Sequence, residues 1–143
     1  MPYRYLDDIA IADAAFEAWG GTLEEMLLAA ADAAINVMVG NLDAIAAVAH
    51  RHFTLEESQL DMLLFQILQE LVYYKDAERL LLRVRNARVM QYPDRWTAEV
   101  DASGDFINAE IHELVTDVKA VTLHRLRVQQ TSRGWYATVV LDT

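Results

Sequence analysis

The sequence contains no cysteine, so it can form neither a disulfide framework nor a thiolate site, which fits a reducing compartment. It also lacks targeting and membrane segments. Residues 1–8 (MPYRYLDD) have neither the basic start nor the apolar run of a signal peptide, and no uncharged run approaches the ~18 residues of a membrane span. We therefore expect a cytoplasmic protein that does not enter membranes.

Positive charge is scarce. The chain has 12 Lys and Arg residues against 22 Asp and Glu residues, which gives a formal net charge of −10. Such a field repels phosphate groups and anionic lipid surfaces, so direct nucleic-acid binding is not expected. A role near nucleic acid would instead require contact with a basic protein that holds the nucleic acid.

Common catalytic signatures are missing too. The sequence has no Gly-rich phosphate loop, no Gly-x-Ser-x-Gly elbow and no His-Glu-x-x-His motif, so we assign no catalytic residue and expect a protein that is not an enzyme. What the chain does have is a composition that is 54% hydrophobic over 143 residues. This predicts one globular domain, residues 1–143, with a substantial core.

Two segments, residues 22–25 and 54–57, both read Thr-Leu-Glu-Glu. This is the pattern of a capping box, in which the threonine hydroxyl and the last glutamate satisfy free backbone N–H groups, so two helices are predicted to begin there. Apolar residues follow at helical spacing over residues 23–38, with Gly40 as the stop, and over residues 60–72. The broader second stripe predicts that the second helix is the more deeply buried.

The remaining segments favour strands. Alternating or β-branched patterns occur at residues 14–19, 80–84 and 96–100, the last ended by Ser-Gly-Asp at 103–105, and residues 131–134 form the turn of a terminal hairpin. Residues 41–53 are ambiguous, and we interpret them as a returning strand. The expected fold class is α+β, with two helices packed on one face of a largely antiparallel sheet.

Two carboxylates stand in unusual surroundings. Asp13 is the only charge in residues 9–16, so if it is buried it needs a lysine, backbone N–H groups or a hard cation as partner. Alternatively, Asp13 lies on the outer face of an edge strand, and Asp142 is a solvated carboxylate at the chain end. If the first and last strands meet, Asp13, Asp142 and backbone carbonyls would form an oxygen-only site suited to calcium or magnesium.

Lys119 is also ambiguous. Either its stem lies along the sheet with the ammonium in water, or it faces the acidic residues and bridges them to a partner. His112 and His124 bracket Lys119 and are candidate functional residues, although satisfied histidines are the alternative. His50 and His52 could present two imidazoles to a metal, but no third ligand is near them in the sequence.

Four blocks, taken together, resemble the archease family. They are residues 12–20 (ADAAFEAWG), the Thr-Leu-Glu-Glu helix start at 22–25, residues 112–124 (HELVTDVKAVTLH) and residues 134–142 (GWYATVVLD). The resemblance spans essentially the whole chain in the same order, and the C-terminal block is its most specific part. It implies the archease fold for the single domain.

The resemblance also implies a function. Archeases activate the GTP-dependent RNA ligase of the RtcB type, which joins tRNA halves during tRNA splicing, by promoting its guanylylation and repeated turnover. The family pattern implies a divalent cation, calcium first and magnesium or manganese as alternatives, held by Asp13, Asp142 and Thr143. It implies a functional role for Lys119, and the same block supplies Asp117, His112 and His124 as further candidates.

One part of the family pattern is missing. The N-terminal motif usually reads Asp-His-Thr-Ala-Asp, whereas this chain reads Ile9-Ala10-Ile11-Ala12-Asp13, so Ala10 and Ile11 replace the His and Thr. This predicts weaker support around a bound metal, or an altered surface towards the ligase. Two alternatives follow: a chaperone or scaffold for a tRNA-modifying enzyme such as a methyltransferase, and a small metal-dependent hydrolase, which two carboxylates without a general base support less well.

Overall fold

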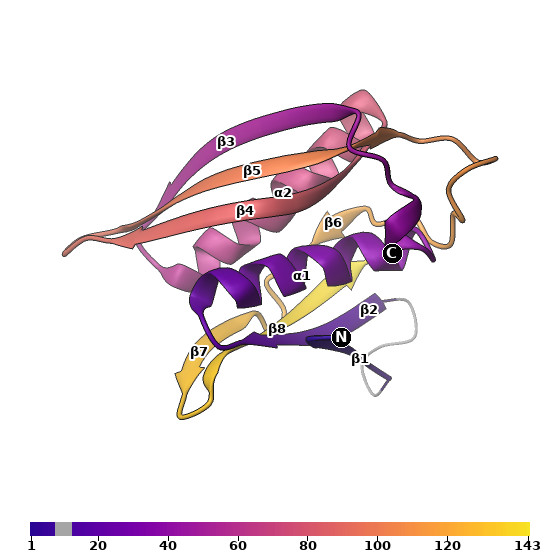
Figure 1. Ribbon diagram of the computed structural model, residues 1–143. Coiled ribbons are helices and arrows are strands. Elements are labelled where there is room, and N and C mark those ends of the chain that lie inside the picture. The colour runs from indigo at the N-terminus through magenta and orange to yellow at the C-terminus, as the bar shows by residue number, and fades with distance from the viewer. Residues whose placement is uncertain (8–12) are drawn as a thin grey trace.

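The computed structural model describes residues 1–7 and 13–143, and its strands form two antiparallel sheets (Figure 1). The larger sheet is five-stranded. Its order is β1 (Tyr3–Leu6), β2 (Asp13–Gly20), β8 (Gly134–Asp142) and β6 (Ala120–Val121), and β7 (Arg127–Thr131) also pairs with β8. The last strand of the chain therefore lies inside this sheet, with β2 on one side and β6 and β7 on the other.

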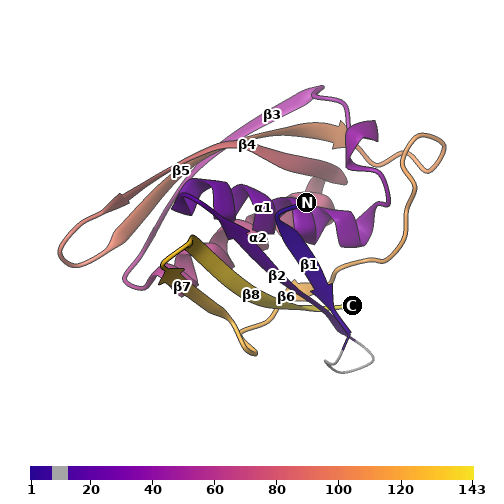
Figure 2. The same ribbon diagram turned by 60° about the horizontal axis from the view of Figure 1, so that its bottom comes forward.

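The second sheet has the order β3 (Ala49–Glu57), β5 (Trp96–Phe106) and β4 (Leu80–Gln91). The helices α1 (Leu23–Met38) and α2 (Leu60–Glu78) lie between the two sheets, and each contacts strands of both (Figure 2). The α+β class, with two helices on antiparallel sheet, is thus confirmed. The structure adds that the strands divide into two sheets, which share one apolar core with the helices.

The first capping box forms where the sequence predicts it. The Thr22 hydroxyl accepts a hydrogen bond of 3.1 Å from the backbone N–H of Glu25, while the Glu25 carboxylate accepts one of 3.2 Å from Gly21 N–H. These contacts satisfy N–H groups at the helix start and place negative charge there, which the helix dipole favours. Helix α1 accordingly begins at Leu23.

The second capping box does not form, and this prediction was wrong. Residues 54–57 belong to β3, and α2 begins at Leu60 after Gln59, whose side chain makes no capping hydrogen bond. In β3, buried Phe53 and half-buried Leu55 alternate with exposed Thr54 and Glu56. This two-residue period suits a strand that pairs with β5. The hydrogen bonds between β3 and β5 stabilise the strand more than a local helix cap at Thr54 would stabilise a helix.

The expected order of helix burial was also wrong. Ten residues of α1 are buried, compared with seven of the longer α2. The buried face of α1 includes Ala29, Ala30, Ala31, Ala33 and Ala34, and such small side chains let a helix approach a sheet on more than one side. Helix α1 consequently packs against β2 and against β4 at once.

The strand expected within residues 41–53 is partly present. A short 3-10 helix, η1 (Leu42–Ala44), comes first, and β3 begins only at Ala49. The strand expected at 96–100 was predicted too short, because β5 continues through Ser103 and Gly104 to Phe106. A Cβ on Gly104 would lie 1.7 Å from the carbonyl oxygen of Leu81. The glycine therefore permits close approach of β4 within the sheet and does not end the strand.

The predicted terminal hairpin is confirmed, with Thr131 paired to Gly134 across the turn between β7 and β8. Gly134 has φ of 125°, a conformation that glycine adopts without strain. A Cβ there would also lie 2.3 Å from the Gly20 carbonyl oxygen at the end of β2. Among the described residues, no helix is long and apolar enough to cross a membrane.

Candidate functional site

Asp13 and Asp142 lie directly opposite each other at the ends of two paired strands. Asp13 begins β2, Asp142 ends β8, and the antiparallel register makes them partners. Directly opposite residues project to the same face of a sheet with Cβ atoms about 5 Å apart. The two carboxylates that the sequence analysis selected from opposite ends of the chain are thus neighbours.

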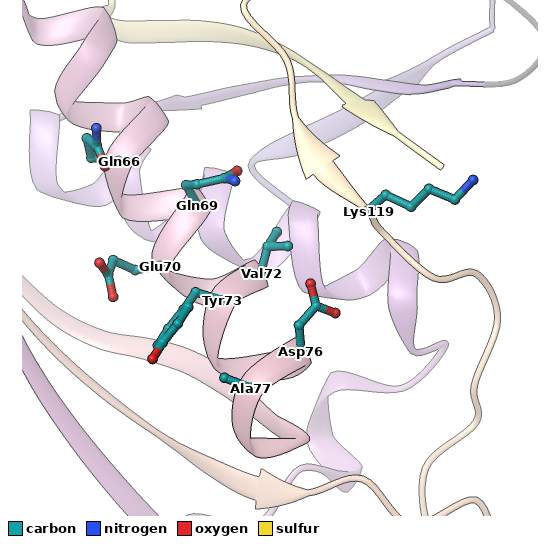
Figure 3. A pocket seen from close by; sticks show the side chains of 8 residues that line it. All are labelled: Gln66, Gln69, Glu70, Val72, Tyr73, Asp76, Ala77 and Lys119. Atoms are coloured by element: carbon teal, nitrogen blue, oxygen red, sulfur yellow. The ribbon is translucent and has the colours of Figure 1, made fainter.

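Lys119 joins these residues from the other side of β8. Its backbone N–H donates a hydrogen bond of 2.9 Å to the Asp142 carbonyl, and the next residue, Ala120, pairs with Asp142. The Lys119 side chain is exposed and extends away from α2 (Figure 3). It borders a groove of about 570 Å³ whose other wall is the outer face of α2, including Tyr73 and Asp76.

The donor set at this strand end consists of oxygen atoms. Asp142 is exposed, Asp13 is partly buried, and Thr143 follows directly in the chain. Like charges placed opposite each other destabilise a strand pair, which favours a cation between them. Carboxylates suit calcium or magnesium, which take six or more oxygen ligands. The described residues hold no cluster of three His, Cys, Asp or Glu, so backbone carbonyls or water would complete such a shell.

Asp117 takes part in a different cluster, around the ammonium of Lys75. Lys75 is only 6% exposed, and its Nζ donates to Asp117 Oδ1 at 2.6 Å, to Asp76 Oδ1 at 2.6 Å and to the Val118 carbonyl at 2.7 Å. Burial lowers the pKa of this ammonium, but the hydrogen bonds to Asp117 and Asp76 outweigh it and raise the pKa overall. The cluster fixes the two residues before Lys119 onto α2.

Sequence reasoning missed Lys75, although a signal was present. The buried face of α2 runs through Leu68, Leu71 and Val72, and Lys75 continues it at the three-and-four spacing. A lysine on an otherwise apolar helical stripe needs acceptors for its ammonium. That requirement pointed to carboxylates elsewhere in the chain, of which Asp117 is one.

His112 is buried, at 1% exposure, and is bound within its own loop. Its Nδ1 accepts a hydrogen bond of 3.0 Å from the backbone N–H of Asn108, so the neutral ring carries its proton on Nε2. Nε2 has no hydrogen-bond partner among the described residues and lies 4.0 Å from Asp105 Oδ2. The ring therefore holds the loop in shape.

The other histidines make local contacts of their own. His124 is exposed in the segment after β6, where its backbone N–H bonds to the Thr122 hydroxyl at 3.2 Å. His50 and His52 are exposed on β3, and His52 Nδ1 lies 2.8 Å from Asp101 Oδ1. That hydrogen bond lowers the pKa of Asp101.

The departure at Ala10 and Ile11 lies outside the described residues. Of the N-terminal motif, the structure describes Asp13 alone. The predicted effect of the two replacements on metal support or on a partner-facing surface stays a prediction.

A model described as the Archease protein family matches residues 3–143. The chain belongs to the archease family. A protein named archease from Methanosarcina acetivorans is 31% identical over 141 residues, which covers 98% of this chain and 94% of the relative. The archease of Thermococcus kodakarensis is 32% identical over 132 residues, which covers 92% of each chain. The resemblance inferred from the four sequence blocks is confirmed.

Solved structures agree with the archease fold. The solution structure of Methanobacterium thermoautotrophicum protein 1598 matches with a TM-score of 0.84 and 29% identity, over 99% of both chains. A crystal structure from Thermotoga maritima, described as an archease and possible chaperone, matches with a TM-score of 0.64 at 18% identity, over 96% of this chain and 97% of that one. At that identity, the second match shows the fold alone.

Proposed function

We propose that this archease is a non-enzymatic accessory protein that activates a GTP-dependent RNA ligase of the RtcB type, promoting its guanylylation and multiple turnover in tRNA splicing. The observation that carries the proposal is the pairing of Asp13 with Asp142, together with the Lys119 N–H bound to the Asp142 carbonyl. Membership of the archease family supports it. The net charge of −10 suits docking on a basic enzyme that binds RNA.

The residues have separate tasks in this proposal. Asp13, Asp142 and Thr143 hold a divalent cation, calcium first and magnesium or manganese as alternatives, which when bound supplies positive charge for a phosphate group of the ligase or its nucleotide. Lys119 presents a second, exposed positive charge beside Asp142. Lys75 and Asp117 fix the segment that carries Lys119.

The test measures multiple-turnover ligation of tRNA halves by the RtcB-type ligase encoded in the same genome. We expect the protein to raise turnover and the Asp142→Ala variant to lose that gain. Glu99→Ala, which removes an exposed carboxylate from the other sheet, is the matched control and should leave the gain intact. No stimulation by the wild-type protein would contradict the proposal.

Calorimetry with calcium, magnesium and manganese separately tests the cation. We expect heat of binding from the wild-type protein and none from Asp142→Ala. If the wild-type protein stimulates the ligase but binds none of the three ions, the proposed cation site is refuted and the proposed activation of the ligase is not.

A second candidate function is a chaperone or scaffold for a tRNA-modifying enzyme such as a methyltransferase. The replacement of the family's His and Thr by Ala10 and Ile11 favours it. Recovery of a methyltransferase but no ligase in a pull-down from the native organism would favour this candidate over the first.

A further inference from the structure

The segment between β5 and β6, residues 107–119, is irregular in form but tightly fastened to α1. Gly40 N–H donates to the Glu113 carbonyl at 2.8 Å, and Val115 N–H donates to the Met38 carbonyl at 2.8 Å. Between these two bonds, Leu114 forms a β-bridge with Val39. The end of α1 therefore fixes the middle of the segment.

Two buried side chains fasten its ends. His112 accepts from Asn108 N–H at 3.0 Å, while its own backbone N–H donates to the Asn108 carbonyl at 2.7 Å. Lys75 binds Asp117 and the Val118 carbonyl. The segment is thus held in one shape by contacts with α1, with α2 and within itself.

This fastened segment exposes large apolar side chains. Ile111 is 56% exposed, Leu114 49% and Val115 61%, and Phe106 just before them is 46% exposed. Exposed apolar groups that gather on one structural element often mark a contact surface for another molecule. Because the backbone is already fixed, little conformational entropy would be lost when a partner covers these groups.

The same segment borders a small, mainly apolar cleft. A cleft of about 160 Å³ is lined by Met38, Leu81, Ile107, Leu114 and Val115, and by Lys75, Thr116 and Asp117 on its polar side. An apolar cavity of about 150 Å³ accommodates a benzene-sized group. The cleft therefore has room for one apolar side chain of a partner, the kind of buried anchor that contributes most to an interface.

The charges of the segment that borders the cleft are mainly negative. Residues 96–118 contain no lysine or arginine, whereas Asp105, Glu110, Glu113 and Asp117 all lie in or beside the segment. Arg79 and Lys119 flank it, and the Lys75 ammonium is already bound by carboxylates. Like-charged rims repel acidic partners and attract basic ones.

The segment is continuous with the candidate site. It runs directly into Lys119, whose N–H bonds to the Asp142 carbonyl. In both views it lies toward the end of the molecule that carries the C-terminus, while the turn of the β4–β5 hairpin lies at the opposite end (Figures 1 and 2).

We propose that residues 106–117 dock a basic amphipathic segment of the partner enzyme, with one apolar side chain in the cleft and lysine or arginine side chains against the acidic rim. This inference rests on the proposed function, because the partner is taken to be the ligase that the protein activates. In this inference, residues 106–117 supply the affinity for the ligase, and Asp13, Asp142 and Lys119 activate it.

The test compares Leu114→Glu with Met90→Glu in binding and stimulation of the ligase from the same genome. Leu114 and Met90 are 49% and 48% exposed, and Met90 lies near the end of β4, at the hairpin turn. We expect Leu114→Glu to weaken ligase binding by about tenfold or more, as for loss of an interface anchor. Met90→Glu should bind like the wild-type protein.

Glu110→Lys provides a second variant, because the Glu110 side chain is exposed and does not line the cleft. It should also weaken binding, whereas Glu99→Lys on the other sheet should not. Thermal melting curves of all variants check that they fold.

The outcomes separate the two proposals. If Asp142→Ala binds the ligase without stimulating it, while Leu114→Glu fails to bind, both proposals are supported. If the wild-type protein stimulates the ligase and Leu114→Glu binds as well as Met90→Glu, the docking surface is overturned and the proposed function stands. A wild-type protein that does not bind the ligase overturns both. If the wild-type protein self-associates in sedimentation and Leu114→Glu does not, while Leu114→Glu still binds the ligase, the surface contacts a second copy of this chain and the inference is overturned.

Discussion

Two lysines close to each other in the structure illustrate how burial decides the task of a residue. Lys75 is almost fully buried and its ammonium has three acceptors, two carboxylates and a carbonyl. Lys119 is exposed, and among the described residues no carboxylate forms an ion pair with it. The first lysine can therefore stabilise the fold, while the second is available for contact with another molecule.

This contrast predicts opposite outcomes for the same substitution. Lys75→Met should lower the free energy of unfolding by about 1–3 kcal/mol, because the Val118 carbonyl loses its donor and charge-assisted hydrogen bonds are lost. The loss should stay below that for a fully buried pair, since Asp117 and Asp76 remain solvated, at 69% and 56% exposure. Urea denaturation measures the change.

Lys119→Met is the matched control and should change stability by no more than about 0.5 kcal/mol, as for other exposed positions. It should nevertheless reduce stimulation of the ligase. Equal destabilisation by the two substitutions would show that the Lys75 cluster does not hold the fold together.

At the scale of single residues, the sequence predicted which residues lie close to one another better than it predicted whether each is buried and what it contacts. Asp13 was selected as the only charge in residues 9–16, and Asp142 and Lys119 as charged residues of the C-terminal blocks. The strand register brings the three to one place. His112 was selected because it brackets Lys119. Its burial against Asn108 depends on how an irregular loop folds back, and neither periodicity nor spacing encodes that.

At the scale of elements, two identical tetrapeptides adopt different structures. Thr-Leu-Glu-Glu caps α1 at residues 22–25 and forms the end of β3 at residues 54–57. The first follows Gly20 and Gly21, which end a strand, whereas the second follows an alternating run that pairs with β5. Local sequence therefore permits a cap in both places, and long-range strand pairing decides against it in one.

Substituting valine for each threonine tests this difference. Thr22→Val should cost about 1–2 kcal/mol, because the hydroxyl that accepts from Glu25 N–H is lost and valine is a poor N-cap. Thr54→Val should be nearly neutral, because valine keeps the branched shape that strands favour and Thr54 is exposed. Thermal or urea unfolding measures both, and equal losses would contradict the assignment of residues 54–57 to a strand.

At the scale of the whole molecule, the sequence predicted the class of the fold but not its two sheets. The pairing of β3 with β5, and of β2 with β8, joins segments that are far apart in the chain. The pattern of each strand reveals its buried face but not its neighbour. The alanine-rich face of α1 was the one indication that more than one layer packs against this helix.

The net charge predicts how association with a basic ligase should depend on salt. With a formal charge of −10, long-range attraction should speed encounter, and salt should screen it. We expect the association rate constant to fall by about tenfold or more between low and high ionic strength, with a smaller change in the dissociation rate constant. Stopped-flow fluorescence or surface plasmon resonance measures both constants. An association rate that does not respond to salt would argue against a basic partner.

The close contact of Gly134 with Gly20 has a consequence for Asp13 and Asp142, which lie at the other end of the β2–β8 pair. Gly20 pairs with Trp135 at one end of the ladder, and Asp13 pairs with Asp142 at the other. A slip of one residue would turn each side chain of β2 to the opposite face relative to β8, so the two carboxylates would no longer share a side. The close packing of Gly134 against Gly20 thus helps to fix the register of β2 against β8. That register places Asp13 opposite Asp142 at the other end of the two strands.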